Sequence, residues 1–340
     1  MTTDLGWDVQ RQEAWDKDPL SIAGAVPGRV VRVERTTAHI RIAGDTVTIH
    51  AADLVVGDWV ATDGSTWARR LPRRTQLTRQ SSDRTSNEQA LAANVDAVII
   101  VEPSSPTPSL RRIERMLTLA WASGARPVVV LTKKDLAERD VTDDAAAVAF
   151  GVEVLSVSSA TGEGLDALAG LLDPDQTFVL IGPSGAGKSS LVNALAGADI
   201  LSTGEVRPDG RGRHTTTRRE LIAIDGLGCL IDTPGIRAVG MTASEEGVGA
   251  TFEDILSFAH QCRFNDCAHE FEPGCAVMDA VEDGSLDPER FSSYKRIERE
   301  ISHQRRRKEA HSRSDERLDT KGRRTAVRVV MTAKGRRTGR

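Results

Sequence analysis

Apolar and polar positions change their pattern along the chain. Residues 24–75 contain short β-rich segments separated by turn residues, among them GRVVRV, AHIRI, DTVTIHA and GDWVAT. Strands this short and this closely spaced predict a small barrel of the OB or SH3 kind. The basic segment LPRRTQLTRQ that follows predicts a linker.

From residue 95, short apolar runs alternate with helical segments. The apolar runs predict strands at 95–101, 127–131, 152–157 and 177–182. The segments between them predict helices at 110–124, 142–150 and 165–172, and another after residue 187. RELIAI and LGCLID then predict a β-pair joined by Asp225 and Gly226. This alternation is typical of an α/β domain with a mostly parallel sheet.

The pattern therefore predicts a multidomain chain. Its parts are an N-terminal extension at 1–23, an OB-type β-barrel at 24–78, an α/β domain at 79–245, a small mostly helical domain at 246–304 and a basic, disordered tail at 305–340.

Composition narrows the class of protein. Hydrophobic residues make up 39% of the 340 residues, which is enough for real cores, but no apolar run approaches the ~20 residues of a membrane span. The acidic start has no apolar signal segment. Three of the four cysteines cluster near a histidine, which favours metal binding in a reducing compartment over disulfides. We therefore expect a cytoplasmic protein without membrane contact.

The formal net charge of −4 hides an asymmetry. Residues 305–340 contain 14 Lys and Arg against 4 Asp and Glu, so the tail carries +10 and the rest of the chain −14. A basic tail on an acidic body indicates a polyanionic partner, and a merely solvated tail is the alternative.

One glycine-rich segment predicts a phosphate site. GPSGAGKS, residues 182–189, follows a predicted strand and opens a predicted helix, as a P-loop does. Its backbone N–H groups would surround phosphate oxygens, Lys188 would reach the β- and γ-phosphates, and Ser189 would hold Mg²⁺. The predicted phosphate-binding residues are Gly182, Pro183, Ser184, Gly185, Ala186, Gly187, Lys188, Ser189 and Ser190.

A second motif follows the strand CLID. Asp232 and Gly235 form a D-x-x-G sequence, in which the carboxylate would hold Mg²⁺ through water and the glycine N–H would meet the γ-phosphate.

A third motif precedes the P-loop in the chain and predicts a guanine site. Thr132, Lys133, Lys134 and Asp135 follow a predicted strand, where ligands of open α/β sheets bind. The Asp135 carboxylate could accept from guanine N1–H and the exocyclic amine together, which adenine does not offer. Ser159 and Ala160 follow the next strand, and the Ala160 N–H could contact guanine O6. A polar loop without a ligand is the alternative.

A cysteine-rich segment predicts a structural zinc site. Cys262, Cys267, His269 and Cys275 offer three thiolates and one imidazole, a closed tetrahedral set for Zn²⁺. Cys229 lies in an apolar strand and is interpreted as core.

The order of these motifs resembles that of the circularly permuted GTPases, and most closely the ribosome small-subunit-dependent GTPase A family (RsgA). The resemblance covers roughly residues 24–300 and includes VGDWV, NVDAVIIV, TGEGL, GPSGAGKSSLVNAL and DTPGIR. DPDQ at 173–176 would be the linker that joins the original ends of the domain.

The resemblance implies a GTPase that binds GTP with Mg²⁺ and acts on the small ribosomal subunit and its rRNA. We expect the protein to be a monomer. It implies that His214 of switch I is catalytic, since Ile236 stands where many GTPases carry a water-positioning Gln. Thr216 is the expected switch I ligand of Mg²⁺. Thr132 replaces the usual Asn, and we expect it to lack the amide that would contact guanine N7 and brace the P-loop.

Basic residues near the barrel indicate an RNA contact. Arg69, Arg70, Arg73 and Arg74 form an electrostatic footprint, whereas Trp59 and Trp67 are interpreted as core rather than as stacking residues. Two alternatives to a ribosome-stimulated GTPase stay open. One is a nucleotide-sensing rRNA-binding protein with incidental hydrolysis, and the other, disfavoured by Asp135, is an ATP-driven remodelling enzyme.

Overall fold

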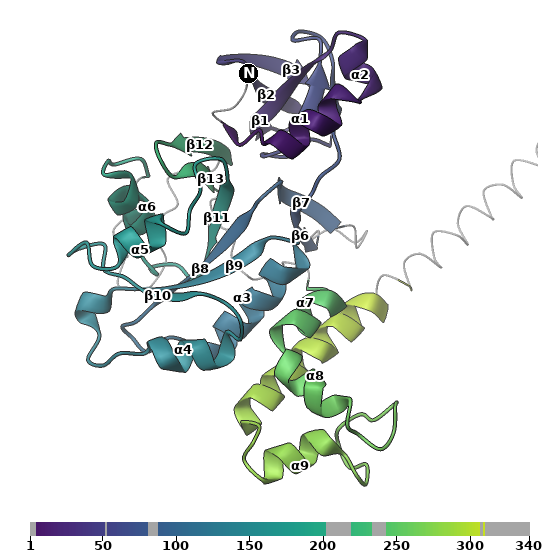
Figure 1. The fold of residues 1–340 in the computed structure, drawn as a ribbon, viewed down its shortest axis with the longest axis vertical. Coiled ribbons are helices and arrows are strands. Elements are labelled where there is room, and N and C mark those ends of the chain that lie inside the picture. The colour runs from purple at the N-terminus through teal and green to yellow at the C-terminus, as the bar shows by residue number, and fades with distance from the viewer. Residues whose placement is uncertain are drawn as a thin grey trace, which may run out of the picture.

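The computed structural model describes residues 5–51, 53–80, 88–201, 219–232, 243–306 and 309. A small β unit, a central α/β unit and a helical unit follow one another from the N-terminus to the C-terminus (Figure 1). No helix among the described residues is long and apolar enough to cross a membrane.

The N-terminal unit is an antiparallel sheet. Its strands are β1 (Val26–Glu34), β2 (Thr37–Ile42), β3 (Asp45–His50), β4 (Trp59–Thr62) and β5 (Ala68–Arg70). They pair in the order β3-β2-β1-β4-β5, and the long β1 also pairs with β12 of the central unit. The segments that the sequence predicts as strands are strands here.

The N-terminal extension is folded onto this sheet. It forms α1 (Val9–Asp16) and α2 (Pro19–Ile22), each preceded by an aspartate whose side chain accepts an N–H of the first turn. The rings of Trp7 and Trp59 pack edge to face with 4.6 Å between their centroids. Trp59 is 1% exposed, which confirms the core interpretation of this residue. The same interpretation of Trp67 was wrong, because Trp67 lies in the turn between β4 and β5 and is 39% exposed.

The predicted linker is instead part of a hairpin. β6 (Gln76–Gln80) pairs antiparallel with β7 (Glu88–Ala93), with Leu77 and Ala92 opposite one another and both fully buried. The prediction of a linker was wrong because Leu77 finds its apolar partners on β7 and the central unit, which the basic local sequence does not indicate.

The central unit is built on a mostly parallel sheet. Its strands are β8 (Ala97–Pro103), β9 (Arg126–Thr132), β10 (Val154–Ser156), β11 (Thr177–Ile181), β12 (Glu220–Ile224) and β13 (Gly228–Asp232), in the order β10-β9-β8-β11-β13-β12. β8 to β11 and β13 run parallel, and β12 pairs antiparallel with β13 across the predicted Asp225-Gly226 turn.

Helices cover both faces of this sheet. They are α3 (Leu110–Ala122), α4 (Thr142–Val148), α5 (Leu165–Ala169), α6 (Lys188–Ala196) and the short 3₁₀ turn η2 (Lys134–Leu136). Side chains of β8 alternate between the two cores: Ile100 packs with α3 and α4, and Ile99 packs with α5 and α6. Both faces of the sheet are therefore buried, as the apolar runs predict.

The C-terminal unit is helical, as predicted. It contains α7 (Glu245–Thr251), α8 (Glu253–Ala259), α9 (Ala276–Glu282) and a further helix over 288–306. α7 packs directly on α3, and a Cβ on Gly247 would lie 2.3 Å from the Thr118 carbonyl oxygen. The unit is therefore docked on the central domain through α3.

Candidate functional site

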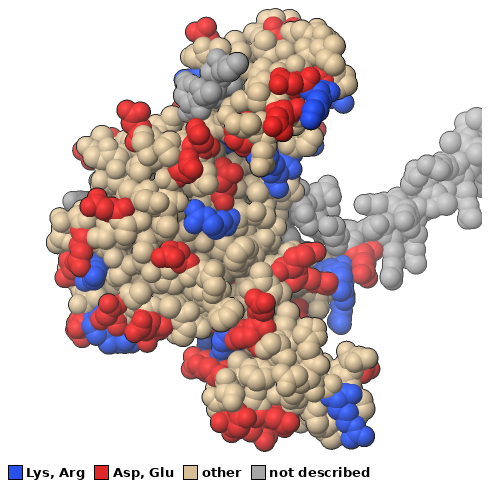
Figure 2. Space-filling model, viewed as in Figure 1, with Lys and Arg blue, Asp and Glu red and all other residues tan. Residues whose placement is uncertain are grey.

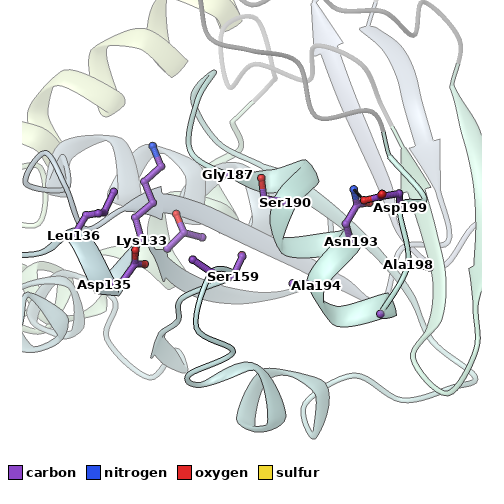
Figure 3. A pocket seen from close by; sticks show the side chains of 13 residues that line it. Lys133, Asp135, Leu136, Ser159, Gly187, Ser190, Asn193, Ala194, Ala198 and Asp199 are labelled. Carbon is purple, nitrogen blue, oxygen red and sulfur yellow. Dashed lines mark hydrogen bonds between the residues drawn. The ribbon is translucent and has the colours of Figure 1, made fainter.

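The predicted nucleotide motifs meet at one edge of the central sheet. β9, β10, β11 and β13 are parallel, so the loops that follow them emerge at their carboxyl ends. A cavity of about 620 Å³ opens there (Figure 3). It is lined by Thr132, Lys133, Asp135, Leu136, Ser159, Ala160, Gly187, Ser190, Asn193, Ala194, Gly197, Ala198 and Asp199.

Seven of these lining residues are among the predicted nucleotide-binding residues, and six are not. Leu136 follows the guanine motif, while the other five belong to the second half of α6 and the turn after it, as Figure 3 shows. Asn193 holds that turn, because its side chain accepts from Leu201 N at 2.8 Å and donates to Leu201 O at 2.8 Å. The sequence carries no motif that marks this wall of the cavity.

The phosphate loop has the backbone that its glycines permit. Gly182, Gly185 and Gly187 have φ of 154°, 78° and 85°, which side-chain-bearing residues rarely adopt. A Cβ on Gly182 would lie 2.2 Å from the Val101 carbonyl oxygen, so only glycine fits between the loop and β8. The loop leads into α6, whose N-terminus favours negative charge.

Lys188 lies across the phosphate loop. Its Nζ donates to the Gly182 carbonyl oxygen at 3.0 Å and to the Pro183 carbonyl oxygen at 2.7 Å. The ammonium group is thus held over the concave side of the loop, where a phosphate would compete with these carbonyls as a charged and stronger acceptor.

Asp135 is oriented by a residue that sequence reasoning missed. The Ser158 hydroxyl donates to Asp135 Oδ1 at 2.6 Å, and Ser158 is fully buried two residues after the end of β10. Its oxygen also accepts the N–H groups of Ala160 at 3.3 Å and Thr161 at 3.2 Å. Ser158 therefore ties the carboxylate of the guanine motif to the loop after β10. The sequence offered one indication of this role: Ser158 is the first residue after the predicted apolar strand 152–157.

The same loop is braced from outside. Lys134 Nζ pairs with Glu163 Oε1 at 2.7 Å, and this carboxylate raises the pKa of Lys134. Lys134 thus points toward solvent, whereas Lys133 has a left-handed backbone (φ 58°) and lines the cavity. Of the two lysines, Lys133 lies where a base can contact it.

Thr132 braces the P-loop, which corrects one expectation. Its hydroxyl donates to the Ala186 carbonyl oxygen at 2.5 Å, and both residues are buried. We expect from the sequence that threonine lacks the group to make this connection. That expectation was wrong because the packed strand end brings the short hydroxyl directly against the loop, so no longer amide is needed.

Three predicted site residues, His214, Thr216 and Gly235, lie outside the described residues, as does Ile236. Asp232 ends β13, which is the direct neighbour of the P-loop strand β11. Ser189 is the second residue of α6. The carboxylate and hydroxyl proposed for Mg²⁺ therefore follow adjacent parallel strands.

The four predicted zinc ligands form a compact cluster, with their ligand atoms all within 4.8 Å of one another. Cys262 Sγ lies 3.9 Å from Cys275 Sγ and 3.6 Å from His269 Nδ1, and Nδ1 lies 3.4 Å from Cys275 Sγ. Tetrahedral Zn²⁺ with its usual bond lengths requires edges of roughly 3.8 Å between sulfurs and roughly 3.5 Å between sulfur and nitrogen. The residues present therefore fit a zinc ion.

Local structure supports the same ligation. Cys275 caps α9 and accepts Met278 N–H at 3.5 Å. Burial, with a smaller effect of Lys295, lowers the pKa of His269, which favours the neutral ring that a metal ligand needs. Cys229 lies buried in β13, apart from this cluster, as predicted.

Comparisons with known proteins agree with this arrangement. The family model described as RsgA GTPase matches residues 70–242. The small ribosomal subunit biogenesis GTPase RsgA of Streptomyces coelicolor is 44% identical over 97% of this chain and 94% of its own length. The protein of the same name from Xanthomonas euvesicatoria is 39% identical over 88% of each chain.

Two solved structures share the fold. The crystal structure of YjeQ from Thermotoga maritima has a TM-score of 0.60 at 26% identity and covers 82% of this chain and 98% of its own. The structure described as YloQ, a circularly permuted GTPase, has a TM-score of 0.57 at 26% identity and covers 82% and 96%. The chain belongs to the RsgA GTPase family.

Proposed function

We propose that this protein is a Mg²⁺-dependent GTPase that binds the small ribosomal subunit and acts in its late maturation, with hydrolysis stimulated by the subunit. The enzymatic part rests on one observation: the guanine motif around Asp135, the loop that contains Ser158 and the P-loop meet at the same cavity. The ribosomal part is supported by family membership and by the names of the relatives. Such a partner is cytoplasmic.

The roles of the individual groups follow from this edge. Asp135, held by Ser158, would accept from guanine N1–H and the exocyclic amine, with Lys133 along the base and the Ser159–Ala160 loop near O6. Lys188 would exchange its two carbonyl partners for phosphate oxygens. Ser189 and Thr216 would hold Mg²⁺, with Asp232 acting through water, and Gly235 would meet the γ-phosphate. His214 would position the attacking water.

The division into domains is part of the proposal. The sheet order β3-β2-β1-β4-β5 at the N-terminus supports an OB-type barrel over 24–78, and β6 pairs with β7 in a separate two-stranded sheet. Residues 79–245 would form the permuted GTPase domain and 246–304 the zinc domain. The proposed permutation linker, residues 173–176, lies between α5 and β11 and forms a turn in which Gln176 N–H donates to the Asp173 carbonyl oxygen at 2.9 Å.

An RNA contact is proposed on the N-terminal unit, where a cavity of about 540 Å³ is lined by Arg69, Arg70 and Arg73. Arg69 and Arg70 are exposed, whereas Arg73 binds both oxygens of buried Asp58, at 2.6 and 2.8 Å. On the face drawn in Figure 2, the described basic side chains stand in small groups among acidic ones. We therefore assign contact with RNA phosphates to Arg69 and Arg70, and a structural role to Arg73.

The decisive experiment measures GTP hydrolysis by the purified protein with and without small ribosomal subunits at fixed salt. We expect a large rise with subunits that is absent in Lys188→Ala. Binding of GTP without any rise, on mature or immature subunits, would favour the alternative, a nucleotide-sensing rRNA-binding protein. Size-exclusion chromatography with light scattering tests whether the protein is a monomer.

A further inference from the structure

The hydroxyl of Thr132 lies between the two halves of the nucleotide site. β9 ends at this residue, whose side chain is 2% exposed but lines the cavity. Two carbonyl oxygens face its Oγ1, that of Ala186 at 2.5 Å and that of Glu102 at 3.4 Å. A carbonyl oxygen can only accept, so the hydroxyl must be the donor in either contact.

A hydroxyl has a single hydrogen to donate. The contact to Ala186 is 0.9 Å shorter than the contact to Glu102, and therefore takes this hydrogen. Guanine N7 is an acceptor and is satisfied only by a donor. A threonine that donates to the phosphate loop consequently has no hydrogen left for N7, whereas an asparagine at this position would bring two N–H groups.

The backbone around Thr132 prevents an easy exchange of partners. Its carbonyl oxygen accepts Ser104 N–H at 2.7 Å, and the pairing of Thr132 with Pro103 continues the β8–β9 ladder to its end. Ala186 is 1% exposed and belongs to the core cluster under the P-loop. Both ends of the hydrogen bond are therefore held in place, so the hydroxyl stays on the loop.

We infer that Thr132 is a positioning residue that ties the guanine loop to the phosphate loop while leaving guanine N7 unread. The inference rests on the proposed function and adds a specificity to it: the site distinguishes nucleotides by the N1 and N2 edge that faces Asp135 and tolerates change at position 7. Guanine nucleotides with a 7-deaza base belong to the class of ligand that this site accepts.

The test compares the dissociation constants of GDP and 7-deaza-GDP for the full-length chain by calorimetry. We expect the wild-type ratio to lie within about twofold. Thr132→Asn, which adds a donor, is expected to acquire a preference for GDP of about three- to tenfold, the worth of one hydrogen bond. Thr132→Val removes the donor at nearly constant volume and is expected to weaken the binding of both nucleotides equally, by about three- to tenfold. Thr132→Ser keeps the hydroxyl and is expected to restore the wild-type affinities.

Two results overturn the inference. A wild-type preference for GDP over 7-deaza-GDP of tenfold or more shows that a donor contacts N7. That donor is Thr132 if Thr132→Val abolishes the preference, and another group if the preference persists in this variant. Unchanged GDP affinity in Thr132→Val shows that the tie to Ala186 has no role in positioning. Failure of the proposed function is distinguishable from both, because the wild-type chain would then bind neither nucleotide.

Discussion

Nη1 of Arg290 lies 3.1 Å from Oε1 of Glu114, in the buried contact between the C-terminal helices and α3. The same guanidinium binds both oxygens of Asp254, at 2.6 and 2.7 Å, and donates to the carbonyls of Val148 and Thr251. One side chain thus joins the helical unit to the central domain. Because the chain after Asp232 leads into this unit, nucleotide-dependent movement there would have to work against a docked interface.

Removal of Arg290 should destabilise this interface strongly. Arg290→Met leaves the 2%-exposed Glu114 carboxylate without its cation, and we expect a loss of about 3–5 kcal/mol in the free energy of unfolding. Urea denaturation followed by circular dichroism measures it. Arg111→Ala is the matched control, because Arg111 and Glu289 are exposed and 3.7 Å apart, and it should cost less than about 1 kcal/mol. Equal losses in the two variants would contradict the prediction.

Glu114 should also make stability depend on pH. Burial raises its pKa above the usual 4.5, and Ser293 and Arg290 offset this only in part. At pH values between about 4.5 and this raised pKa, Glu114 is therefore more protonated in the folded state than in the unfolded state, so its contribution to stability falls as the pH rises through that window. The difference in unfolding free energy between wild type and Glu114→Gln should decrease over that window. A difference that stays constant over this pH range would refute the raised pKa of Glu114.

Ser158 should matter for guanine binding through Asp135. Ser158→Ala removes the donor 2.6 Å from Oδ1 and the acceptor of two loop N–H groups, so the carboxylate loses its fixed orientation. We expect the dissociation constant of GDP to rise by about tenfold, the worth of roughly 1.4 kcal/mol. Its neighbour Ser159→Ala keeps the backbone of the loop and should change affinity less than threefold. A larger effect at Ser159 than at Ser158 would reverse this assignment.

Zinc should be bound by the Cys₃His cluster and should stabilise the helical unit. The purified protein is expected to contain about one zinc per chain, and Cys267→Ser should lose it together with resistance of residues 243–306 to proteolysis. Cys229→Ala, which alters the cysteine in β13, should keep its zinc. Elemental analysis provides the measurement, and full zinc occupancy in Cys267→Ser would exclude this ligand set.

Local patterns predicted the elements of the central domain well. The apolar runs at 95–101, 127–131 and 177–182 are strands because β-branched residues buried on both faces of a sheet need no polar alternation. The segment at 71–80 was predicted wrongly as a linker. Its strand depends on pairing with residues 88–93, and pairing energy between distant segments is not visible in either segment alone.

The sequence by itself determined the chemistry that this protein can perform. Glycine spacing in the P-loop, the carboxylate of Asp135 and the spacing of the zinc ligands are local properties, since each needs only a strand end or a short loop to be displayed. Only the tertiary structure decided which distant groups orient these site residues and join the domains. Ser158 meets Asp135, Thr132 meets Ala186 and Arg290 meets Glu114 across 23, 54 and 176 positions. Such contacts form only when packed strands and helices bring polar groups within hydrogen-bond distance, and an unpaired state is costly for those of the groups that are buried.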